Sequence, residues 1–202
     1  MTDQNRRQML KTLAAAPAAL AFTWTMEEAA EASTQSQQAR ANAAASKTAY
    51  KPRFFTAHEY ATIVLLGDMI LPKDARSGSA SEAGAPEFID HIVAEQPARQ
   101  VAMRGGLQWL DRECVKRFDK KFLACADTER RLVLDDIAWP RKARPAMSQG
   151  VRFFTTMRDL VATGFWSSRV GVRDLGYMGN VMLGEWTGAP DEVLQKLGVN
   201  YT

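Results

Sequence analysis

Two histidines and two cysteines have the widest chemical range among the side chains of this 202-residue chain. A neutral imidazole can act as a general base or a metal ligand, and a thiolate can attack a substrate. A helical di-iron site needs Glu-x-x-His twice, whereas "EFIDH" occurs once, with a different spacing. We therefore predict that His58 and His91 face solvent or make local hydrogen bonds.

Sequence motifs that hold a cofactor are missing. The glycines do not form a Gly-x-Gly-x-x-Gly after a strand, and neither a phosphate-binding Gly-Lys-Ser/Thr nor a Gly-x-Ser-x-Gly occurs. Two cysteines are too few for an iron–sulfur cluster, and the Cys-x-x-Cys-His of a c-type haem is absent. We predict that this chain has no catalytic residue and binds neither cofactor nor metal.

The two cysteines, Cys114 and Cys125, leave three alternatives open. In an oxidising compartment they can pair in an intramolecular disulfide that closes a modest loop. They can also remain as buried free thiols, or one of them can bridge to another chain.

The first residues resemble a twin-arginine export signal. A basic head precedes the apolar stretch "LAAAPAALAFTW", which is shorter than the roughly 20 residues that span a bilayer. The usual form is Ser/Thr-Arg-Arg-x-Phe-Leu-Lys, from which Asn5 and Met9 depart mildly. The predicted signal residues are Arg6, Arg7, Met9, Leu10 and Lys11.

The twin-arginine pathway carries proteins that have already folded, so its passenger holds a cofactor or escorts a partner that does. The small-x-small triplet Ala30 to Ala32 is a plausible cleavage site, and an earlier cut near Ala21 is an alternative. A signal that stays uncleaved would act as a membrane anchor, with Phe22 and Trp24 at the interface. We expect localisation in the periplasm or on the periplasmic face of the inner membrane.

The rest of the chain reads as a single all-α domain. Thr56 and Glu59 form a capping box ahead of an apolar helical face, and Pro72 ends that helix. Glycine and aromatic residues in 164–186 show no clean period, so we predict an ordered, irregular segment there. We predict helices at about 57–71, 86–96, 98–118, 128–139, 149–163 and 190–198.

Three regions follow from these signals. Residues 1–32 are predicted as the signal peptide, 33–52 as a disordered linker rich in Ala, Ser and Gln, and 53–202 as the helical domain. The formal charge is only +3, and no basic stripe with interleaved aromatics occurs. Both observations argue against nucleic-acid binding as the function.

Aromatic and arginine residues gather in the irregular segment. Protein interfaces are enriched in Trp, Tyr and Arg, so this segment is a candidate partner-docking surface, with a local core role as the alternative. The residues concerned are Phe165, Trp166, Arg169, Arg173, Tyr177 and Trp186.

The order of several motifs resembles the small subunit, subunit 3, of gluconate 2-dehydrogenase and related periplasmic sugar dehydrogenases. The resemblance spans about residues 53–199. Besides the twin-arginine start, it rests on "FFTAHEYATIVLLGDMILPKD", "GAPEFIDHIV", "RGGLQWLD", "VLDDIAWP", "FFTTMRDLVATGFWSS" and "DLGYMGN".

The resemblance implies a non-catalytic partner of a large flavoprotein of the glucose–methanol–choline type. That partner would bind FAD, oxidise a sugar or sugar acid, and pass electrons to a cytochrome c subunit or another acceptor. The small subunit would fold with it and lend it the export signal, and membrane association would come through the partner or an uncleaved signal. A self-contained periplasmic binding protein for a small molecule or envelope component, and a stand-alone enzyme or metal protein, remain as alternatives.

Overall fold

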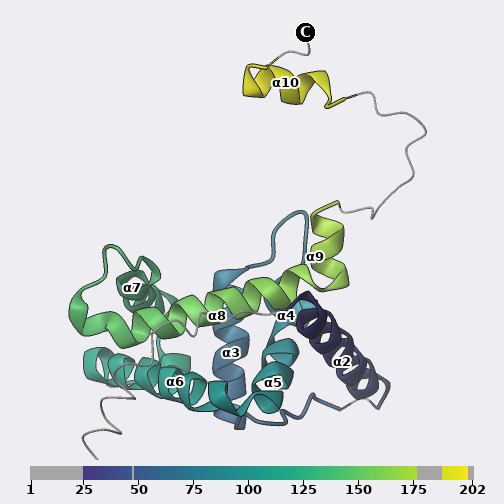
Figure 1. Ribbon diagram of the computed structural model, residues 1–202. Coiled ribbons are helices and arrows are strands. Elements are labelled where there is room, and N and C mark those ends of the chain that lie inside the picture. The colour runs from purple at the N-terminus through teal and green to yellow at the C-terminus, as the bar shows by residue number, and fades with distance from the viewer. Residues whose placement is uncertain (1–24, 47, 177–187, 200–202) are drawn as a thin grey trace, which may run out of the picture.

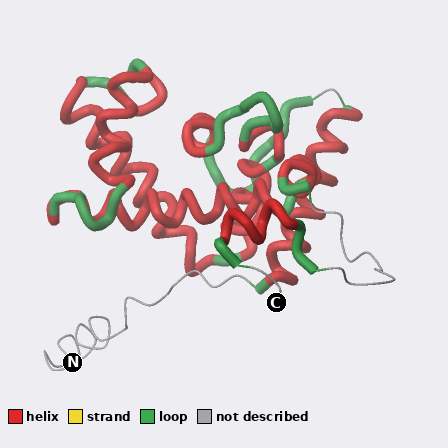
Figure 2. The backbone as a smooth tube through the Cα atoms, turned by 90° about the horizontal axis from the view of Figure 1, so that it is seen from above, coloured by secondary structure: helices red, strands yellow, loops and turns green. Residues whose placement is uncertain are grey.

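The computed structural model describes residues 25–46, 48–176 and 188–199, and within these ranges the chain is built from helices and loops without strands (Figure 2). The prediction of an all-α fold is confirmed. The α-helices are α2 (Met26–Ala45), α3 (Ala57–Ile70), α4 (Ala80–Ala83), α5 (Ala85–Glu95), α6 (Pro97–Phe118), α7 (Asp127–Ala138), α8 (Ser148–Trp166), α9 (Arg169–Asp174) and α10 (Asp191–Leu197), with 3₁₀ turns η1 (Phe122–Ala124) and η2 (Pro145–Met147).

All six predicted helices are present, as α3, α5, α6, α7, α8 and α10. The capping box of α3 forms as expected: the Thr56 hydroxyl accepts from the Glu59 amide at 3.3 Å, and the Glu59 carboxylate accepts from the Thr56 amide at 2.8 Å. No residue of α10 is buried. In the described ranges, no helix combines the length and apolar character needed to cross a membrane.

The prediction of an irregular segment from residue 164 is wrong for its first part. Helix α8 continues through Gly164 to Trp166, and α9 follows. A Cβ at Gly164 would lie 2.9 Å from the Phe88 ring, so this glycine allows α8 to approach α5 closely rather than ending the helix. The later part of the segment, 177–186, lies outside the described residues.

The prediction of a disordered linker at 33–52 is also wrong for most of its length. Helix α2 occupies Met26–Ala45 and packs against α5 and α8 (Figure 1). Its buried residues are alanines and serines, which leave no large apolar side chains to reveal a helical period in the sequence. The predicted boundary at residue 32 therefore falls inside a helix.

The hydrophobic core lies where α8 crosses α3, α5, α6 and α7 (Figure 1). Phe88 of α5, Leu110 of α6 and Met157 of α8 are each at most 1% exposed. Burying side chains of this size stabilises a fold by about 1.5–3 kcal/mol each. Helix α2 packs against α5 and α8 of this core, and α9 packs against α8.

Two glycines let α6 and α8 interlock. A Cβ added to Gly106 of α6 would collide with the ring of Phe153 on α8, and one added to Gly150 of α8 would collide with the indole of Trp109 on α6. Each aromatic ring therefore occupies the space that the glycine on the facing helix leaves free. The sequence shows two adjacent glycines in α6, Gly105 and Gly106, but not which of them contacts α8.

We expect opposite results from alanine at the two adjacent glycines of α6. Gly105 is exposed and a Cβ there would meet no atom within 4 Å, so Gly105→Ala should raise the free energy of unfolding by about 0.5–1 kcal/mol through helix propensity. Gly106→Ala should lower it by about 1–3 kcal/mol, because Phe153 must move. Urea denaturation followed by circular dichroism measures both, and equal effects would contradict the interlocked packing.

Candidate docking surface

The end of α8 and the short helix α9 form an exposed corner, which we call the α8–α9 corner. It comprises Trp166, Arg169, Arg173 and Leu175. The bend between the helices is fixed by Ser168, whose hydroxyl donates to the Phe165 carbonyl at 2.7 Å and accepts from the Gly171 amide at 3.1 Å. Because Ser168 is itself buried, these hydrogen bonds hold the corner in a defined shape.

The predicted docking residues differ in their exposure to solvent. Trp166 is 37% exposed, whereas its neighbour Phe165 is 3% exposed and belongs to the core. The two rings pack edge to face, with centroids 4.8 Å apart. The prediction that Phe165 contacts a partner therefore does not fit this structure, because its ring lies beneath the surface. Tyr177 and Trp186 lie outside the described residues.

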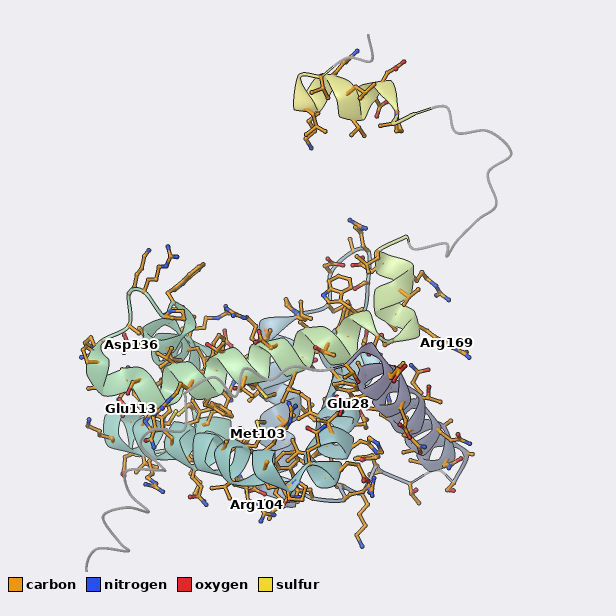
Figure 3. The ribbon with its side chains drawn as sticks, viewed as in Figure 1. Glu28, Met103, Arg104, Glu113, Asp136 and Arg169 are labelled. Carbon is orange, nitrogen blue, oxygen red and sulfur yellow. The ribbon has the colours of Figure 1, made fainter. Side chains whose placement is uncertain are left out.

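Positive charge surrounds the exposed indole. Arg169 and Arg173 are both exposed, and neither has an ion-pair partner within the described part of the chain. Arg169 points away from the helical body (Figure 3). The only carboxylate of α9, Asp174, faces Arg76 at 3.6 Å, and the Arg76 guanidinium also donates to the Asp174 carbonyl at 2.8 Å. The corner is therefore cationic.

A shallow groove of about 470 Å³ lies beside the corner, between α2 and the end of α8. None of the residues that line it carries a charge, so it suits a small apolar or hydroxyl-bearing side chain rather than an ionised ligand. Its walls are held together by the Ser33 hydroxyl of α2, which donates to the Ser167 carbonyl at 2.9 Å. The lining residues are Ala29, Ala30, Ser33, Thr34, Gln37, Thr163, Trp166 and Ser167.

A second tryptophan is exposed at the other end of α8. Trp139, at the end of α7, is 65% exposed, and the Lys142 ammonium lies 5.9 Å from its ring centroid. A groove of about 380 Å³ begins next to it at Pro140, and two arginines, Arg144 and Arg152, are among its lining residues. We take the α8–α9 corner as the candidate because Trp166 itself lines the adjoining groove, whose other lining residues are uncharged.

The histidines make structural contacts. His58 Nε2 lies 2.6 Å from Asp111 Oδ2, and the other oxygen of Asp111 accepts from the Phe122 amide at 3.0 Å. His91 Nδ1 lies 3.0 Å from the Arg53 guanidinium. Both histidines are therefore in contact with residues 53 and 38 positions away in sequence, rather than with near neighbours as predicted. In the described ranges, no three His, Cys, Asp or Glu residues are grouped to hold a metal ion.

The two cysteines are neighbouring buried thiols. Cys114 on α6 is fully buried and Cys125, just after η1, is 3% exposed. The pKa of Cys114 is raised to about 12, first by burial and then by the adjacent Cys125 thiol. Both are free in this structure. A bridge to another chain would require local unfolding, while an intramolecular disulfide between these neighbours stays a prediction.

Carboxylates and tyrosines form a buried cluster beneath α2. Burial raises the pKa of Glu87, while the Arg40 guanidinium at 3.5 Å and the Tyr60 hydroxyl favour its charged form. Burial and the nearby carboxylates raise the pKa values of Tyr50 and Tyr60 above the usual range. Asp90, although beside His91 in sequence, is fully buried. Asp90 and Tyr50 are hydrogen-bonded to each other inside the fold, whereas Glu87 Oε2 is buried without a hydrogen-bond partner in the described part of the chain. We assign the cluster a structural role.

Comparison with known proteins gives one match. The sequence model of the family described as gluconate 2-dehydrogenase subunit 3 matches residues 57–188, which include α3 to α9. No curated protein and no solved structure gives a significant match.

Proposed function

The chain belongs to the gluconate 2-dehydrogenase subunit 3 family, and from that premise we propose that it is the non-catalytic small subunit of a periplasmic, FAD-dependent sugar or sugar-acid dehydrogenase. A subunit 3 is one chain of a multi-subunit dehydrogenase, so the family already implies partner subunits. The observation that carries the proposal is this family match. It is supported by residues near the start that resemble a twin-arginine signal and by a sequence without cofactor motifs.

In this proposal the catalytic partner is a large flavoprotein of the glucose–methanol–choline type without an export signal of its own. It folds around FAD in the cytoplasm, binds this chain, and crosses the inner membrane with it through the signal at Arg6 and Arg7. In the periplasm the flavoprotein oxidises its substrate and passes electrons to a cytochrome c subunit or another acceptor. This chain acts as folding partner and export escort.

The α8–α9 corner is the surface that we propose for the flavoprotein. An exposed indole beside two cations without ion-pair partners suits a partner surface with an apolar socket and carboxylates around it. The adjoining groove can take one further side chain from that surface.

The proposal is tested by purifying the tagged chain from native periplasm and membranes. We expect a large second chain and a flavin absorption spectrum in the purified material. Changing Arg6→Lys and Arg7→Lys together should remove most of the flavoprotein from the periplasm and leave it in the cytoplasm, because the twin-arginine pathway reads the paired arginines.

A matched double change at Arg152→Lys and Arg158→Lys provides the control, since both arginines are exposed on α8. It should leave the distribution of the flavoprotein unchanged. A colourless, monomeric, well-folded protein without a second chain would overturn the proposal and favour a self-contained periplasmic binding protein.

A further inference from the structure

We infer that the whole of α2 stays in the mature protein, so that export processing does not cut after Ala32 and the mature chain begins at or before Thr25. The inference rests on the proposed function in one respect, namely that the protein crosses the membrane folded. It excludes the small-x-small triplet Ala30 to Ala32 as the processing site, although the triplet has the right sequence for one.

Helix α2 packs on the domain through one continuous face. Its buried residues Ala29, Ala32, Ser33 and Ser36 follow the i, i+3, i+4, i+7 spacing of a helix face directed at a core. This face lies against α5 and the end of α8 (Figure 1). Small side chains let the helix backbones approach closely, which explains why a stretch without large apolar residues still belongs to the folded body.

Polar contacts fix α2 at two further points. Ser33 donates to the Ser167 carbonyl at 2.9 Å, and Arg40 donates to the Glu82 carbonyl at 3.0 Å. Arg40 also lies 3.5 Å from the carboxylate of the buried Glu87. Gly84, whose φ is +90°, leaves the space that the Arg40 side chain occupies. Without α2, Glu87 would lose the cation that offsets its burial.

A cut after Ala32 would remove the first turns of α2, including Ala29 and Ala32 of its buried face. It would hydrolyse the Ala32–Ser33 peptide bond with one water, leaving a carboxylate on Ala32 and a charged amino group on Ser33. The charged amino group would stand at the N-terminus of the helix that remains, where the helix macrodipole disfavours a cation. The cut would also remove the capping box of Thr25 and Glu28 and leave residues 33–45, a length that is marginal for a helix in water.

The peptidase would also have difficulty reaching this bond. A protease binds its substrate in an extended conformation, whereas residues 26–45 are helical and Ala32 is 2% exposed. If the passenger crosses the membrane folded, α2 is already docked when it meets the peptidase. Cleavage upstream of Thr25, for example near Ala21, does not require α2 to unfold. A signal that is retained does not require it either.

The experiment is N-terminal sequencing and intact-mass measurement of the chain purified with its native partners from periplasm and membranes. We expect a first residue no later than Thr25. A first residue at Ser33, or anywhere within α2, overturns the inference. The flavin spectrum and second chain are recorded on the same sample, so loss of the partner with an intact α2 would count against the proposed function alone.

Two variants at Ala30 sharpen the test. Ala30 is exposed on α2 and lines the groove beside the corner, so the readout of these variants is the first residue of the chain and not flavoprotein binding. Ala30→Leu leaves the buried face of α2 intact but destroys the small residue that a cut after Ala32 requires. Ala30→Ser keeps a small residue and serves as the control. We expect both variants to be processed to the same first residue as the unaltered chain, while accumulation of precursor in Ala30→Leu alone would show that the triplet is used.

Discussion

Replacing Asp90 with alanine should lower the free energy of unfolding by about 3–5 kcal/mol, as expected when a buried, hydrogen-bonded charge is removed from its partners. Asp90 is fully buried in α5. Its Oδ2 accepts from the Tyr50 hydroxyl at 2.8 Å and the Arg53 amide at 2.7 Å, and its Oδ1 accepts from the amides of Phe54 and Phe55 at 3.1 and 3.2 Å.

The size of the effect follows from what the carboxylate holds together. Three successive backbone N–H groups, from 53 to 55, would lose their acceptor, and a buried donor without a partner costs about 1–3 kcal/mol. Phe55 is part of the hydrophobic core and directly precedes the cap of α3. The loss should therefore loosen the start of α3 as well as the segment that joins it to α2.

Urea denaturation followed by circular dichroism measures this prediction. Asp90→Asn keeps one acceptor oxygen and should cost less than Asp90→Ala, while Asp135→Asn, at an exposed position of α7, should change stability by no more than about 0.5 kcal/mol. If Asp90→Ala were as mild as Asp135→Asn, the carboxylate would not hold the 53–55 segment as the structure indicates.

Sequence reasoning succeeded where large apolar residues and capping signals coincide. The helix α3 has both, with Thr56 and Glu59 at its start. In α5, Phe88, Ile89, Ile92 and Val93 have the spacing of one helical face, and all four are buried. Such signals are local, so they can be read without knowing what the helix contacts.

Sequence reasoning failed where the determining contact is distant in the chain. Nothing in the local sequence indicates that Asp90 is buried, because its partners, residues 50–55, lie far from it in sequence. The composition of α2 predicts a linker, because alanine and serine pack as well as larger residues only when the facing helix is close, and no local period in the sequence shows that it is. A Thr25–Glu28 capping box was the one signal that could have indicated α2.

The sequence could not predict which residues of the candidate site are exposed, and the reason is geometric. Phe165 and Trp166 are adjacent in a helix, so they point to different faces, and only one of them can belong to the surface. The sequence named this segment as the docking candidate but could not show that Phe165 faces the core while Trp166, Arg169 and Arg173 face outward.

Replacing Trp166 with alanine should weaken binding to the flavoprotein by about 30- to 1,000-fold, the range expected for a tryptophan that anchors an interface at about 2–4 kcal/mol. Trp166 combines partial exposure with a fixed orientation against Phe165 and a place in the wall of the groove. Arg169→Glu should weaken binding as well, and chiefly slow association, because it reverses a charge at an exposed position of the corner.

Trp139→Ala is the matched control. Trp139 is more exposed than Trp166, but it directly follows α7 and precedes the start of α8, whereas Trp166 is the last residue of α8. At about 1.5 Å per residue, α8 is roughly 28 Å long. Titration of the purified subunit into the flavoprotein gives both affinities, and thermal unfolding shows whether each variant remains folded. Unchanged binding of a folded Trp166→Ala would remove the α8–α9 corner as the docking surface. Loss of binding in Trp139→Ala alone would move that surface to the end of α7.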